Sequence, residues 1–188
     1  MALDSKKKQI ITPLAIIFSV ILADQITKLI AKLYLRPVHS IPILGDFLKL
    51  TYVENQGMAF GIQIGNKFLF NILSMIAIVI IIIYLFKLKD HSILKFSFTL
   101  ILGGAFGNLI DRFLYGRVVD FIDVEFFDIS FDGLNLLFLN IPPYYMSRWP
   151  VFNIADMAVS IGMILIIATA IFERKPQHVV NDTAQEDI

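Results

Sequence analysis

The chain has 188 residues, of which 57% are hydrophobic and 17% are charged, and it contains no cysteine. In soluble domains about a quarter of all residues are charged, so this composition predicts a single domain that lies in a membrane. A formal net charge of zero gives no sign of nucleic-acid binding, and the lack of cysteine excludes disulfides, thiol nucleophiles, zinc–thiolate sites and lipid attachment through cysteine.

The first apolar stretch, about residues 10–33, follows three consecutive lysines and imitates a secretory signal peptide. No A-x-A-like cleavage site closes it, so we expect a retained helix. Its uninterrupted apolar part is shorter than the ~20 residues that cross a bilayer, so the helix must continue through Asp24 and Lys28. These charges then lie in the membrane or near its surface, where a simple ion pair at i,i+4 is an alternative to a functional role.

Three further apolar stretches, about residues 68–86, 93–114 and 151–172, are also long enough to cross a bilayer. The sequence therefore predicts an α-helical membrane protein with four transmembrane helices. One integral membrane domain over residues 1–175 precedes a polar tail, residues 176–188, that we expect to be disordered. Basic residues gather before the first helix, between the second and third, and after the fourth, so the positive-inside rule places both termini in the cytoplasm.

The two longer connections, about residues 34–67 and 115–150, then face the outside. The segments 46–55 and 116–127 are rich in β-branched and aromatic residues and predict short strands on the outer face. The segment 131–150 is rich in aromatic residues, Pro and Gly, and we predict an interfacial loop there.

Polar residues of three helices fall at one depth. Counted from the charges at the cytoplasmic ends, Asp24, Arg112 and Asp156 each lie about 24–26 Å along their helices. Asn108 shares a helix face with Arg112, and Asn153 shares one with Asp156. Three helices therefore bring polar side chains to one level just inside the outer surface.

The helices differ in what they offer for packing. The second helix has no ionisable group between Lys67 and Tyr84, so we assign it to packing and lipid contact. The third carries small residues that let it lie close against a neighbour: Gly103, Gly104, Ala105 and Gly107.

Several of these polar residues have a purely structural alternative. Arg112 could reach lipid phosphates, Asp111 could be an exposed charge at a helix end, and Asn55 could shape a turn. The role of Asn108 and Asn153 could be limited to hydrogen bonds that link neighbouring helices.

The acidic residues beyond the third helix differ in how well such an alternative fits. Asp120 could be an exposed strand residue. Asp156 resists a structural explanation best, because it begins an apolar helix where its carboxylate needs a partner.

Elimination leaves carboxylates as the reactive groups. The three histidines (His39, His91, His178) are dispersed, and neither H-E-x-x-H nor G-x-S-x-G is present. Two carboxylates in a poorly hydrated site share one proton. The charged one can take a proton from water, while the neutral one donates to a carbonyl oxygen and later to the leaving amine, as in aspartic proteases. The candidates are Asp24, Asp111, Asp120, Asp123 and Asp156.

Five ordered blocks of this sequence resemble the bacterial lipoprotein signal peptidases (signal peptidase II). The blocks are DQITK (24–28), NQGMAFG (55–61), GGAFGNLIDR (103–112), VVDFID (118–123) and FNIAD (152–156). The resemblance covers about residues 10–172 and implies four membrane helices with a small periplasmic β-layer. The chain departs from the family at Met58, where a small residue is usual, and in a longer connection from Asp123 to Asn153, where we expect an extra flap over the cleft.

The resemblance also implies a function: an intramembrane aspartic endopeptidase that removes signal peptides from diacylglyceryl-modified prolipoproteins, cutting before the lipidated Cys. It implies a catalytic dyad of Asp120 and Asp156, with no metal or cofactor. The supporting residues that we expect are Asp24, Lys28, Asn55, Gly104, Asn108, Arg112 and Asn153.

The expected setting is the bacterial cytoplasmic (inner) membrane, with the active site near the periplasmic face. The expected partners are the diacylated prolipoprotein and membrane lipid, with no nucleic acid, and the expected state is a monomer. Two other classes remain as alternatives. A proton-coupled carrier would use intramembrane aspartates, although the chain shows no repeated halves, and a non-catalytic scaffold would bind a partner through its outer loops.

Overall fold

The computed structural model of this chain describes residues 2–56, 67–88, 91–125, 128–136 and 139–172. The helices of this part are α1 (Ala2–Ile30), continued by a short π-helix η1 (Ala31–Leu35), α2 (Lys67–Lys87), α3 (Ser92–Tyr115) and α4 (Ile154–Phe172). The predicted tail and Met58 lie outside the described residues.

The first helix passes through Asp24 and Lys28 without a break, and η1 carries it on to Leu35. Within the described residues, three helices are long and apolar enough to cross a membrane: Gln9–Leu35, Ser92–Tyr115 and Ile154–Phe172. The apolar part of α2, Asn71–Lys87, is shorter and does not reach the length of these three spans. The molecule is therefore mostly helical and suited to a membrane, while the prediction of four spans stays a prediction.

Helix α3 lies at the centre of the helical part, where it packs against α1, α2 and α4. Its glycines permit this close approach. A Cβ at Gly104 would collide with the carbonyl oxygen of Ala155, and one at Gly107 would lie 2.7 Å from a carboxylate oxygen of Asp24. Glycine at these two positions is what lets α3 contact the backbone of α4 and the side chains of α1.

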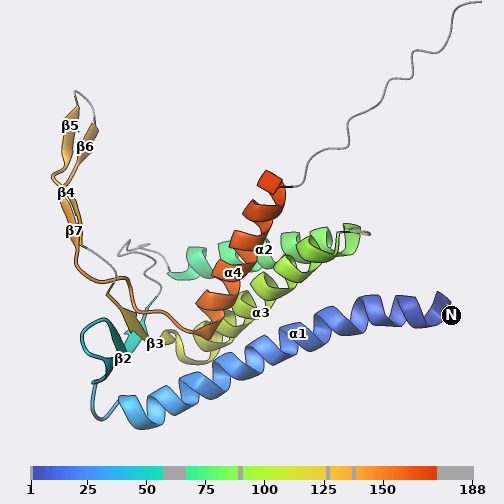
Figure 1. Cartoon of the computed structure of the whole chain (residues 1–188), viewed down its shortest axis with the longest axis horizontal. Helices are drawn as coiled ribbons and strands as arrows, with labels where there is room; N and C mark the ends of the chain where they lie inside the picture. Colours follow the sequence, from blue (N-terminus) through green and yellow to red (C-terminus); the bar gives the residue numbers. More distant parts are fainter. Residues whose placement is uncertain (1, 57–66, 89–90, 126–127, 137–138, 173–188) are drawn as a thin grey trace, which may run out of the picture.

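A three-stranded antiparallel sheet, in the order β1-β2-β3, lies where α1 and α3 end and α4 begins (Figure 1). Its strands are β1 (Ser40–Leu44), β2 (Leu48–Asn55) and β3 (Val118–Val124). Strands β2 and β3 fall within the two segments for which strands were predicted. A small apolar core of Ala31, Leu35, Val119 and Phe121 joins η1 to β3.

The prediction of a loop over residues 131–150 is wrong. Strand β4 (Ile129–Phe131) pairs with β7 (Tyr144–Met146), and β5 (Leu134–Leu136) pairs with β6 (Leu139–Ile141). The aromatic and branched residues that favour a membrane interface also have high β-propensity, and two such segments close in sequence can pair. These strands extend away from the helices in Figure 1, which does not match the expected flap over a cleft.

Candidate active site

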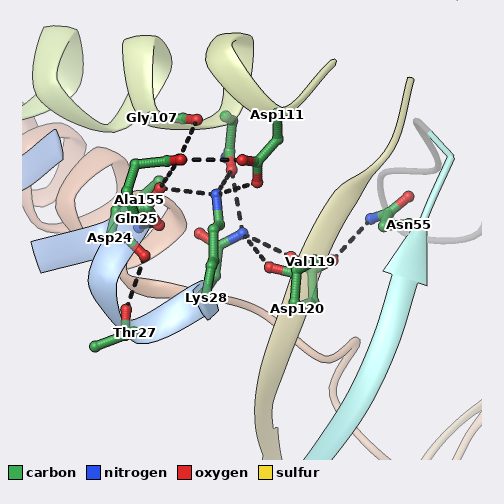
Figure 2. A network of polar contacts seen from close by, with 12 residues as sticks. Asp24, Gln25, Thr27, Lys28, Asn55, Gly107, Asp111, Val119, Asp120 and Ala155 are labelled. Carbon is green, nitrogen blue, oxygen red and sulfur yellow. Dashed lines mark hydrogen bonds and ion pairs between the residues drawn. The ribbon is translucent and has the colours of Figure 1, made fainter. Parts of the chain in front are cut away.

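Lys28 of α1 is the centre of a buried ionic cluster. Its Nζ atom lies 2.8 Å from Asp24 Oδ2 and 2.8 Å from Asp111 Oδ2, and it donates a hydrogen bond of 2.9 Å to Asn108 Oδ1. Figure 2 shows Lys28 reaching from α1 toward Asp111 of α3. Buried charges are tolerated only with partners, and here one ammonium serves two carboxylates. The predicted ion pair of Asp24 and Lys28 is therefore present, but as part of a larger cluster.

Asp111 is buried, with 3% of its surface exposed, so its interpretation as an exposed charge at a helix end is wrong. The reason is tertiary: α1 packs against this face of α3 and covers it. Gln25 completes the contact, because its Nε2 atom donates to Asp111 Oδ1 at 3.1 Å and to the carbonyl oxygen of Gly107 at 3.2 Å. Gln25 was not among the predicted site residues, although it lies three residues before Lys28 and thus on the same helix face.

Helix α4 begins with a reciprocal cap between Asn153 and Asp156. The backbone N–H of Asp156 donates to Asn153 Oδ1 at 2.9 Å, and the backbone N–H of Asn153 donates to Asp156 Oδ2 at 3.2 Å. This is the arrangement of a capping box, with Asn153 as the N-cap and the acidic residue three positions later. The cap fixes Asp156 in the first turn of α4, where the helix dipole favours negative charge.

Asp120 of β3 is buried, which contradicts its alternative as an exposed strand residue. Asn153 Nδ2 donates to its Oδ1 at 2.6 Å, and Asn55 Nδ2, at the end of β2, donates to its Oδ2 at 3.1 Å (Figure 2). Burial raises the pKa of Asp120 to about 7, and the negative charge of Asp156 adds to this effect. Asp120 is thus a carboxyl group that can both hold and release a proton near neutral pH.

Two asparagines connect Asp120 to Asp156. Asn153 Nδ2 also donates to Asn108 Oδ1 at 3.1 Å, and Asn108 Nδ2 donates to Asp156 Oδ1 at 2.8 Å. Asn108 and Asn153 therefore do link α3 to α4, but both also hold a carboxylate. The path Asp120–Asn153–Asn108–Asp156 joins β3, α3 and the start of α4.

The other expected site residues lie at different distances from this path. Arg112, one helical turn after Asn108, is half-buried, and its charge acts on Asp156, Asp120 and Asp111. Gly104 takes part through the contact of α3 with α4 described above.

Asp123 does not join the carboxylate path. It accepts hydrogen bonds from Thr51 Oγ1 of β2 at 2.7 Å and from Arg148 Nε at 2.8 Å. These contacts link β3 to β2 and to the segment before α4. Within the described residues, no group of three or more His, Asp or Glu could hold a metal ion.

The arrangement brings two carboxyl groups from different elements into one polar site and gives them different surroundings. Asp120 lies in a strand and favours the protonated form, whereas Asp156 receives two N–H donors at a helix N-terminus. A pair of carboxyl groups with unlike environments can act as an acid and a base in one reaction.

The chain is similar to known proteins over most of its length. Residues 16–172 match the family model described as signal peptidase (SPase) II. It is 38% identical to a lipoprotein signal peptidase of Halothermothrix orenii, over 81% of this chain and 90% of that one. It is also 39% identical to a lipoprotein signal peptidase of Caldanaerobacter subterraneus subsp. tengcongensis, over 85% of this chain and 96% of that one. A solved structure described as a bacterial membrane enzyme matches with a TM-score of 0.67 and 30% identity, over 95% of both chains.

Proposed function

This chain belongs to the signal peptidase II family, and from that premise we propose that it is an intramembrane aspartic endopeptidase. Its substrates would be prolipoproteins that carry diacylglycerol on the lipobox Cys, and it would cut the signal peptide just before that Cys. The observation that carries the proposal is the path of hydrogen bonds that joins Asp120 to Asp156 through two asparagines.

In the first step, Asp120 is protonated and Asp156 is ionised. Asp156 takes a proton from a water molecule, whose oxygen forms a bond to the scissile carbonyl carbon, while Asp120 gives its proton to the carbonyl oxygen. The raised pKa of Asp120 supports its role as the acid. Arg112 and Lys28 supply positive charge beside this site, which offsets the two carboxyl groups.

In the second step the tetrahedral adduct breaks down. After the first step Asp156 holds the proton from water and is the neutral carboxyl group, while Asp120 is ionised. Asp156 therefore donates this proton to the leaving amine nitrogen as the C–N bond breaks, and Asp120 takes back a proton from the adduct hydroxyl. The products are a new carboxyl group on the signal peptide and a free amine on the lipidated Cys. Both aspartates return to their starting protonation states, so no cofactor is consumed.

The membrane setting follows from the same proposal. We infer four spans, with α2 as the additional one, both termini in the cytoplasm of a bacterial inner membrane, and the dyad near the periplasmic face. The diacylglyceryl group holds the scissile bond at the membrane surface, which is the level at which α1, α3 and α4 present their polar residues. A monomer contains all the residues that this mechanism uses.

The test is cleavage of a diacylated prolipoprotein by purified wild-type protein and by Asp120→Asn and Asp156→Asn variants. We expect both variants to remain folded and inserted in the membrane and to lose cleavage. Asp46→Asn, on the turn between β1 and β2, is the matched control and should cleave normally. Cleavage by either dyad variant would end the proposal, and equal turnover of an unlipidated precursor would remove the role given to the lipid.

A further inference from the structure

A polar cavity lies beside the carboxylate site. Its volume is about 400 Å³, and neither Asp120 nor Asp156 lines it. The lining residues come from the end of α1, from η1, from β2 and β3, and from the end of α3. They are Gln25, Lys28, Leu29, Lys32, Arg36, Glu54, Asp111, Tyr115, Arg117 and Val119.

The lining carries four cations and two carboxylates. Each carboxylate already has its cation: Asp111 pairs with Lys28 at 2.8 Å, and Glu54 pairs with Arg117 at 2.5 Å. The excess positive charge therefore belongs to Lys32 and Arg36.

Lys32 and Arg36 are the two cations available to a ligand. Among the described residues, no carboxylate lies within ion-pair distance of either side chain. The ammonium of Lys32 lies 4.6 Å from the centre of the Tyr115 ring, a cation–π contact that holds the side chain in place and leaves its N–H groups free to donate. Arg36 is exposed and lines the same cavity.

The position of these two cations along α1 points to the class of ligand. Lys28, Lys32 and Arg36 follow one another at intervals of four residues, and the apolar span that contains the first two ends at Leu35. Lys32 and Arg36 thus stand where the hydrocarbon region gives way to lipid head groups. Two unpaired cations, one of them a guanidinium, are suited to a phosphate group.

Leu29 of the cavity lining is exposed, and so are three apolar residues that lie within two positions of the lining residues Lys32 and Tyr115 in the chain. Leu29 and Leu33 are 56% and 60% exposed on α1 and η1, and Phe113 and Leu114 are 64% and 67% exposed at the end of α3. Acyl chains can lie against these side chains while a phosphate enters the cavity, whereas a free phosphate would make no use of them.

We propose that this cavity binds a phosphate ester through Lys32 and Arg36, and that the adjoining apolar surface selects the phosphate of a membrane phospholipid. The proposal requires insertion of α1 in a membrane but does not depend on peptidase activity. Because Lys28 belongs both to this cavity and to the ionic cluster that contacts Asn108, a bound phospholipid would stand next to the carboxylate site.

The test is native mass spectrometry of the full-length protein titrated with phosphatidylglycerol, and with diacylglycerol of the same acyl chains. We expect tighter binding of phosphatidylglycerol. Lys32→Gln and Arg36→Gln should each weaken that binding about tenfold, because each variant loses one charge-assisted hydrogen bond to the phosphate. Lys32→Arg should retain it. The matched control is Lys49→Gln. The ammonium of Lys49 pairs with Asp46 at 2.6 Å and lies outside the cavity.

Inorganic phosphate, added as a competitor, separates the two sources of the ligand. Lipid binding that phosphate does not displace identifies a phospholipid site, and displacement identifies a phosphate site that accepts both. Equal binding of diacylglycerol, or unchanged affinity for phosphatidylglycerol in both Gln variants, would overturn the proposal. Thermal unfolding of each variant shows that it is folded, so a loss of binding cannot be attributed to unfolding.

Discussion

Asn153 and Asp156 exchange two hydrogen bonds across the first turn of α4, each accepting the backbone N–H of the other on a side-chain oxygen. The side-chain nitrogen of the same residue, Asn153 Nδ2, also donates to Asp120 Oδ1 at 2.6 Å. The cap that begins α4 and the contact that holds Asp120 are thus made by one side chain. A change in that side chain affects both the start of α4 and the hydrogen bond to Asp120, and suitable substitutions can separate the two effects.

Substitution of Asn153 tests this separation. Asn153→Ala removes the cap and should lower the free energy of unfolding by about 0.5–2 kcal/mol, with loss of cleavage. Asn153→Asp keeps an oxygen that can accept the N–H of Asp156, but it loses the donor to Asp120. We expect it to retain more stability than Asn153→Ala and still to lose cleavage. Thermal unfolding and the cleavage assay measure the two effects, and normal cleavage by Asn153→Asp would show that the donor is dispensable.

The ionic cluster predicts a large effect on stability at Lys28. Lys28→Met would leave the carboxylates of Asp24 and Asp111 buried without their cation, which costs about 3–5 kcal/mol of folding free energy. Lys49→Met, which removes the half-buried cation that pairs with the exposed Asp46, should have no measurable effect. Unfolding in a mild detergent compares the two variants. Similar stabilities would mean that water or a proton compensates the cluster.

The raised pKa of Asp120 predicts a dependence of stability on pH. Its ordinary pKa is 3.8, and burial raises the pKa to about 7 in the folded chain. Between these values the folded state holds a proton that the unfolded state has released, so the wild-type protein loses stability as pH rises from 3.8 to about 7. Asp120→Asn is neutral throughout and lacks this loss.

The measurement is the difference in free energy of unfolding between Asp120→Asn and wild type across that range. We expect the advantage of the variant to grow with pH and to level off above about 7, where Asp120 is ionised in both states. A difference that stays constant with pH would show that Asp120 is not the group whose pKa is raised.

The contact of α3 with α4 gives a prediction for Gly104. A side chain at this position meets the carbonyl oxygen of Ala155 and Val159 Cγ2, so Gly104→Val must push the two helices apart. Overpacking of this kind costs about 1–3 kcal/mol, and the shift should also reduce cleavage because Asn108 and Asp156 lie on these helices. The matched control is Ala105→Val, which introduces the same valine side chain at the next position of α3. Equal effects of the two substitutions on unfolding and cleavage would contradict the close contact.

Much of the helical part could be anticipated from local sequence. The apolar stretches mark α1, α3 and α4, because about 20 apolar residues at 1.5 Å per residue are a property of one segment. The same rise placed Asp24, Arg112 and Asp156 at one level along their own helices. The segments that contain β2 and β3 were also visible in the alternation and composition of the chain.

The partners of individual side chains could not be anticipated in this way. Asp111 looks like an exposed helix-end charge until α1 covers it, and Gln25 has no role until α3 approaches within hydrogen-bonding distance. The strands of residues 129–146 were interpreted as a loop because a short aromatic segment fits an interface and a strand equally well.

The sequence by itself determined which segments are apolar enough for a membrane, how far along each helix the charges lie, and which family the chain resembles. Only the tertiary structure decided that Asn153 of the α4 cap meets Asp120 of β3, and that Lys28 serves two carboxylates. The physical reason is that helix length and amphipathic pattern depend on neighbours in the chain. Hydrogen bonds and ion pairs within about 3 Å depend on how residues that are 33 or 80 positions apart in the chain pack together.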